Sequence, residues 1–177
     1  LFQQFYNLMD TLIVGRFLGV DDLAAVGSTG SVNFLIIGFC MGVCNGFAIP
    51  LAHKFGAGDY KGMRGFMMYA IYLSAIFAVV MTALTVIFCR PILTLMRTPA
   101  NIFEYSYQYI LIIFIGIPAT YLFNLTSGMI RALGNSRAPL IILVISSFLN
   151  VILDLVFILN FNMGVAGAAA ATVLSQV

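Results

Sequence analysis

The sequence predicts an all-α membrane protein, a bundle of six transmembrane helices. Of the 177 residues, 62% are hydrophobic and only 8% are charged, whereas soluble domains carry about 25% charged residues. The apolar stretches are also much longer than the roughly 10-residue alternating segments of a transmembrane β-barrel. Several are long enough to cross a bilayer as a helix, which takes about 20 residues. We therefore expect a polytopic helical protein.

Connectors with glycine, proline and charged residues divide the apolar text into six expected helices. They cover about residues 1–18, 23–52, 65–88, 102–130, 139–161 and 164–177. Gly19 favours an end to the first helix, and Asp21 and Asp22 open the second. Arg90 and Pro91 close the third, since a proline removes a helical hydrogen bond.

The second half of the chain carries its own helix signals. Asn101 can cap the fourth helix, Pro139 is tolerated in the first turn of the fifth, and the sixth begins near Gly164. Pro50, near the end of the second helix, and Pro118, within the fourth, are expected to kink their helices. Such kinks can act as hinges, although passive bends are commoner.

Small residues recur within these helices. Glycines spaced by four in the second helix and an alanine-rich run after Gly164 predict close helix packing, because small side chains let backbones approach in lipid. The glycines are Gly38, Gly42 and Gly46. The three cysteines are interpreted as small core residues rather than disulfide partners or zinc ligands; they are Cys40, Cys44 and Cys89.

The basic residues indicate an orientation. Five lie in the connectors after the second and fourth helices, namely Lys54, Lys61, Arg64, Arg131 and Arg137. Three lie on the opposite side, namely Arg16, Arg90 and Arg97. The positive-inside rule then predicts a multi-pass protein of the cell (inner) membrane with a cytoplasmic N-terminus. Both ends of the sequence fall within helical text, which we interpret as a fragment of a longer membrane protein.

Two carboxylates within the expected helices fall at matching depth. Asp154 and Asn150 are four residues apart and share one helical face. A carboxylate at a helix centre costs about 2.5–3.5 kcal/mol, so such residues commonly serve ion or substrate handling. At about 1.5 Å per residue, Asp10, Asp154 and Thr172 lie roughly 13, 10 and 12 Å from the same membrane face, and Asn150 about one turn deeper.

This set of oxygen ligands fits a hard cation such as Na⁺. It equally fits a proton site, because two nearby carboxylates in a low dielectric resist double ionisation. A polar network that only fastens the helices together is the alternative. Asn33 on the second helix reaches a similar depth; it is a candidate for lining a cavity, although a packing role is commoner. We expect no other metal and no cofactor beyond the coupling ion.

Five ordered motifs resemble one family. They are YNLMDTLIVGRFLGVDDLAAVG at residues 6–27, AHKFGAGDY at 52–60, RALGNSRAP at 131–139, NVILD at 150–154 and GVAGAAAATVLSQ at 164–176. Together they cover most of the chain and resemble the N-terminal half of multidrug and toxic compound extrusion (MATE) transporters of the prokaryotic branch.

The resemblance implies a twelve-helix antiporter of two six-helix lobes, of which this chain supplies the N-terminal one and lacks the C-terminal one. It implies export of cationic or amphipathic drugs and toxic metabolites in exchange for Na⁺ or H⁺. The family's cation-site residues in this lobe match Asp10, Asn150, Asp154 and Thr172. The four residues that the depth estimate groups are thus the same four that the resemblance implies.

Other functions remain open at this point. A flippase for lipid-linked precursors could use the same architecture, but the expected helices hold no mid-depth Arg or Lys for a phosphate. A membrane scaffold or a channel subunit is a further alternative. An enzyme is not expected, because no nucleophile–base or metal–ligand set is present. Nor is a nucleic-acid partner, because the basic residues are scattered. The partners we expect are small-molecule substrates, membrane lipid and the second lobe.

Overall fold

The computed structural model describes residues 2–176, with side chains from Met9 onward. The described residues fold into helices and contain no strand, which confirms the all-α class. The helices are α1 (Phe2–Phe17), α2 (Val20–Gly56), α3 (Tyr60–Leu95), α4 (Phe103–Ile115), α5 (Ile117–Ala132), α6 (Arg137–Leu155) and α7 (Gly164–Leu174). A π-helical segment, η1 (Val156–Asn160), continues α6.

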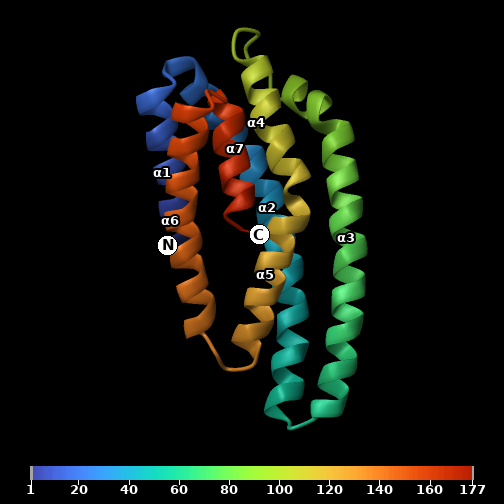
Figure 1. Cartoon of the computed structure of the whole chain (residues 1–177). Coiled ribbons are helices and arrows are strands. Elements are labelled where there is room, and N and C mark those ends of the chain that lie inside the picture. The colour runs from blue at the N-terminus through green and yellow to red at the C-terminus, as the bar shows by residue number, and fades with distance from the viewer. Residues whose placement is uncertain (1, 177) are drawn as a thin grey trace.

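The helices form an elongated bundle (Figure 1). The long helices α2 and α3 make an antiparallel hairpin, and α4 and α5 pack along it. On the other side of the bundle, α1 lies beside α6. The short helix α7 occupies the middle, where it packs mainly against α4 and α6.

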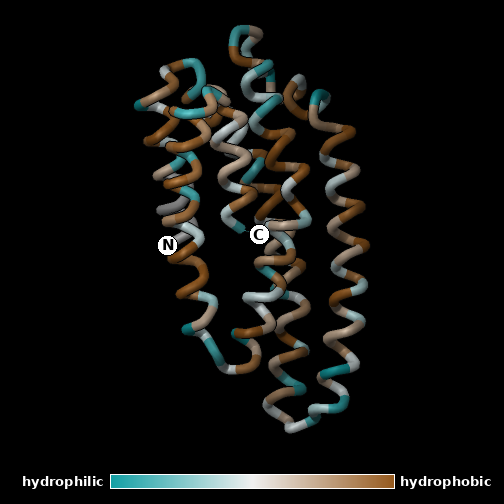
Figure 2. The backbone as a smooth tube through the Cα atoms, viewed as in Figure 1, coloured by the Kyte–Doolittle hydropathy of each residue, from teal (hydrophilic) through white to brown (hydrophobic). Residues whose placement is uncertain are grey.

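Within the described residues, three helices are long and apolar enough to cross a membrane: α2, α3, and α6 together with η1. The pair α4 and α5 makes a fourth span if its 46° bend is counted as part of one crossing. The remaining two are shorter, 16 residues for α1 and 11 for α7. Figure 2 shows hydrophobic colour along the helices and hydrophilic colour at several of the turns.

The helix bounds differ from expectation mainly at two prolines. The third helix does not end at Arg90 and Pro91 but continues to Leu95. Leu93 is fully buried, and its packing holds the last turn in place despite the lost hydrogen bond. The expected fourth helix is two helices, because the chain breaks at Gly116, two residues before Pro118. The expected bend near Pro118 is therefore present, whereas α2 runs through Pro50 as one helix.

Two apolar clusters hold the bundle together. One joins α2, α3, α4 and α5 and contains the fully buried side chains of Leu51, Leu93 and Phe114. The other joins α1, α2, α4, η1 and α7 and contains Val14 and Val165. Burying a side chain of this size contributes about 1.5–3 kcal/mol in water, but in lipid the packing itself is the main contribution.

The small residues behave differently in α7 and α2. In α7, Ala168, Ala169 and Ala171 are fully buried, and a Cβ on Gly167 would lie 3.0 Å from the Cβ of Phe157. Close packing of α7 is thus confirmed. A Cβ on Gly38, Gly42 or Gly46 would meet nothing within 4 Å. The predicted close packing along these three glycines of α2 is therefore wrong for the described residues. Glycine spacing alone does not say which face of a helix meets a neighbour.

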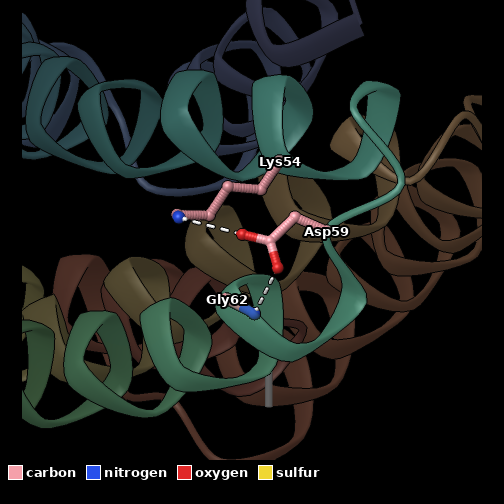
Figure 3. Close-up of polar contacts among 3 residues, drawn as sticks. All are labelled: Lys54, Asp59 and Gly62. Atoms are coloured by element: carbon pink, nitrogen blue, oxygen red, sulfur yellow. Dashed lines mark hydrogen bonds and ion pairs between the residues drawn. The ribbon is translucent and has the colours of Figure 1, made fainter.

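The turn between α2 and α3 is closed by one carboxylate (Figure 3). Asp59 caps α3 by accepting a hydrogen bond of 2.9 Å from the backbone N–H of Gly62. Its other oxygen lies 3.5 Å from the Lys54 ammonium at the end of α2. Gly58 has a φ of +72°, which favours glycine at this turn. The motif at residues 52–60 therefore builds a fixed helical hairpin.

Candidate cation site

Asp10 and Thr172 meet in the interior of the bundle. Asp10 lies on α1 and is only 3% exposed. The Thr172 hydroxyl, on α7, donates to Asp10 Oδ2 at 2.8 Å. The same hydroxyl lies 3.0 Å from the carbonyl oxygen of Ala168, one turn back on its own helix. Because α7 starts at Gly164, Thr172 lies opposite Asp10, which is 162 residues earlier in the chain.

Asn150 and Asp154 lie behind this pair on α6, and both are fully buried. No hydrogen bond of normal geometry reaches the Asn150 amide or either carboxylate oxygen of Asp154 within the described residues, and Asp10 Oδ1 is in the same situation. Both α6 side chains are nevertheless close enough to Asp10 to interact with its carboxylate. Buried polar atoms normally have partners, so this cluster is a candidate site for a further group.

The structure thus brings together all four residues that the depth estimate grouped. Their polar groups are two carboxylates, an amide and a hydroxyl, all on helices that pack against each other. Oxygen donors of this kind suit a hard cation or a proton. Within the described residues, no group of three or more His, Cys, Asp or Glu side chains is placed to hold a metal ion.

A cavity of about 370 Å³ opens beside Asp10 and Thr172. Its wall carries Asn33, whose side-chain oxygen is buried and has no hydrogen-bond partner among the described residues. Much of the rest is apolar, and includes Phe34, Ile37, Met41, Tyr109, Ile113 and Phe123. Asn150 and Asp154 are not among the lining residues, so the cavity reaches the cluster through Asp10 and Thr172.

Sequence reasoning missed four polar residues of this wall: Thr11, Thr120, Ser146 and Gln176. The side-chain oxygen of Gln176 is buried and has no hydrogen-bond partner among the described residues. Helical spacing could have found Ser146 and Gln176, because Ser146 precedes Asn150 by four residues and Gln176 follows Thr172 by four. Residues four apart share a face, so each extends the polar face already identified.

The profile of the MatE family matches residues 1–156. The chain belongs to the MatE family. This confirms the resemblance that the five motifs carried, and with it a family of multi-pass membrane transporters.

Known MatE proteins match nearly the whole chain. The probable multidrug resistance protein YoeA of Bacillus subtilis is 32% identical over 97% of this chain, and the match covers 38% of that protein. The FAD transporter of Shewanella oneidensis is 27% identical over 96% of this chain and 38% of that protein. A crystal structure of MATE in the bent conformation has a TM-score of 0.92 and 30% identity, over 99% of this chain and 39% of that one.

The chain therefore spans about 38% of the length of the curated relatives it matches. This share corresponds to one lobe of a MatE transporter, the N-terminal one, as the sequence predicted. The family consists of transporters rather than enzymes. The roles of Asp10, Asn150, Asp154 and Thr172 stay predictions.

Proposed function

We propose that this chain is the N-terminal lobe of a secondary active antiporter that exports cationic or amphipathic drugs and toxic metabolites in exchange for Na⁺ or H⁺. The observation that carries the proposal is the buried cluster of Asp10, Asn150, Asp154 and Thr172 beside a cavity. The names of relatives such as YoeA support multidrug export. The second lobe and the surrounding lipid are its expected partners.

Two like charges this close in a low dielectric repel each other strongly. A Na⁺ ion held by Asp10 with the carbonyl oxygen of Asn150, or a proton on one of the two acids, removes that repulsion. Either event weakens Asp10 as a hydrogen-bond acceptor for Thr172, and hence changes the contact between α1 and α7. The ion then shifts the transporter between outward- and inward-facing states through its different affinity for the two.

The cavity offers a substrate both charge and ring faces. Asp10 supplies a negative charge at its end, while Phe34, Tyr109 and Phe123 supply aromatic surface. Aromatic faces attract organic cations by about 0.5–2 kcal/mol each. A cationic substrate and the coupling ion would therefore compete for Asp10, which is what antiport requires.

A second candidate is transport of a phosphate-bearing molecule, favoured by the relative named as an FAD transporter. The described residues that line the cavity include no Lys or Arg, although a phosphate is normally held by such groups. The lining therefore favours the cationic substrate, and competition between ethidium and FAD during export separates the two candidates.

The first test is Asp10→Asn in the full-length protein, with ethidium uptake into inside-out vesicles, which corresponds to export from the cell, as the readout. Asparagine keeps the shape but not the charge, so export driven by a Na⁺ or H⁺ gradient should fall at least about tenfold. Applying the two gradients separately identifies the ion. Asp21→Asn is the control, because Asp21 is exposed at the start of α2. Normal gradient-driven export by Asp10→Asn would falsify the proposal.

A further inference from the structure

The bend between α4 and α5 is occupied by one side chain of α7. Gly116 is buried at the break, and the two helices meet there at 46°. A Cβ built on Gly116 would overlap the side chain of Val173, with Cγ1 at 2.9 Å and Cγ2 closer still. Real Cβ contacts are not this short, so only glycine admits Val173 here. Val173 acts as a wedge in the bend.

Val173 is the direct neighbour of Thr172, whose hydroxyl contacts Asp10. That hydroxyl has one proton and, among the described residues, at least two acceptors in reach: Asp10 Oδ2 at 2.8 Å and the Ala168 carbonyl at 3.0 Å. A cation or proton on Asp10 makes its oxygen a poorer acceptor and favours Ala168 instead. Occupancy of the site therefore loosens the attachment of α7 to α1.

Helix α7 is well suited to move as a unit. Its middle is a row of fully buried alanines, and at its other end Gly167 packs on Phe157 of η1. Close packing of small residues leaves little room for side-chain adjustment. A change at Thr172 must therefore be passed on to Val173 rather than absorbed.

Both arms of the bend line the cavity. Tyr109 and Ile113 lie on α4, before the break, and Thr120 and Phe123 lie on α5, after it. The angle at Gly116 thus sets how far apart these walls stand. A wedge in this bend is placed to change the shape of the substrate cavity.

We propose that Val173 and Gly116 are positioning residues, and that their contact couples occupancy of the Asp10–Thr172 pair to the angle between α4 and α5. The inference rests on the proposed function, because it assigns a second role to the same site. Neither residue has a side-chain oxygen to offer an ion. They act by shape alone.

A compensating pair of substitutions tests this contact in the full-length protein. Gly116→Ala adds a methyl group where Val173 lies, and gradient-driven ethidium export should fall about tenfold or more. Val173→Ala removes the γ-methyl groups, so Gly116→Ala with Val173→Ala should restore at least half of the wild-type rate. Gly128→Ala on α5 is the matched control, because its Cβ would meet only the Cβ of Ala48, at an ordinary 3.6 Å.

A distance measurement separates coupling from simple damage to the fold. Spin labels at the exposed positions Tyr105 and Arg131 report the α4–α5 angle in a background with Cys40, Cys44 and Cys89 replaced by alanine. The 26 intervening steps span roughly 39 Å at most. Adding Na⁺ or lowering the pH should shift the mean distance by about 1–2 Å in the wild type. Gly116→Ala should abolish the shift, and the double variant should restore it.

The inference is overturned if Gly116→Ala exports and shifts like the wild type, or if the double variant does no better than Gly116→Ala. Should Gly116→Ala not yield folded protein by gel filtration, Val173→Ala decides: a lost ion response supports the coupling, and an unchanged one refutes it. The Asp10→Asn variant is run in parallel. If Asp10→Asn loses export while the Gly116 variants export normally, only the coupling is refuted. If Asp10→Asn exports normally, the proposed function itself is refuted.

Discussion

At the scale of single residues, the Thr172 hydroxyl has the most consequential position. It bonds a buried carboxylate across two helices while its own helix offers it another acceptor. A hydrogen bond to a charged group is worth about 1.5–3 kcal/mol. Thr172 therefore contributes to how strongly Asp10 holds a charge or an ion.

Thr172→Val keeps the shape of the side chain and removes the hydroxyl. We expect the Na⁺ concentration, or the proton concentration, for half-maximal export to fall about tenfold, because the hydroxyl stabilises the charged, unoccupied Asp10 and its loss favours occupancy. Thr172→Ser retains the hydroxyl and should stay close to the wild type. Export measured against ion concentration checks this, and an unchanged half-maximal concentration in Thr172→Val would remove Thr172 from the site.

The grouping of the four site residues could be predicted because helix rise is fixed. Asp10 and Thr172 are 162 positions apart, yet their distances from helix ends placed them at one depth. Depth does not give direction, however. The sequence could not show that Asp10 and Thr172 line the cavity while Asn150 and Asp154 lie behind them, because that depends on helix rotation within the bundle.

At the scale of elements, the α2–α3 hairpin depends on Asp59. Asp59→Ala removes both the helix cap and the contact with Lys54, and should lower the free energy of unfolding by about 1 kcal/mol. Asp59→Asn keeps a capping oxygen and loses only an exposed ion pair, which is worth less. Thermal unfolding of the full-length protein measures both variants. Equal losses would show that the charge, not the cap, holds the turn.

Helix ends and breaks were harder to predict than helix existence. Composition gave each apolar run, but whether a proline ends a helix depends on what the next turn buries. Pro91 is followed by the buried Leu93, and α3 continues. Pro118 follows Gly116, where a neighbouring side chain fills the bend, and the helix breaks. Both outcomes are set by tertiary contacts that the local sequence does not contain.

At the scale of the whole molecule, the basic residues predict that the α2–α3 turn faces the cytoplasm and the α3–α4 turn faces outward. A membrane-impermeant thiol reagent on intact cells should label Asn101→Cys and spare Lys61→Cys until the cells are opened. The three native cysteines of this chain are buried, so the unmodified chain provides the background. Labelling in the reverse order would invert the orientation and place the candidate cation site at the cytoplasmic side.

The π-helical segment η1 gives α6 a change of phase directly after Asp154. Its wider turn is seen in the bond from the Phe161 N–H to the Val156 carbonyl, five residues back. A π turn holds one residue more than the α-helical path needs, and such insertions are common at functional sites. Side chains before η1 follow the face of Asn150 and Asp154, while those after it are turned by about 100°. Deleting one residue of η1 would therefore leave the face of Asn150 and Asp154 in place and change only the surface against which Gly167 packs.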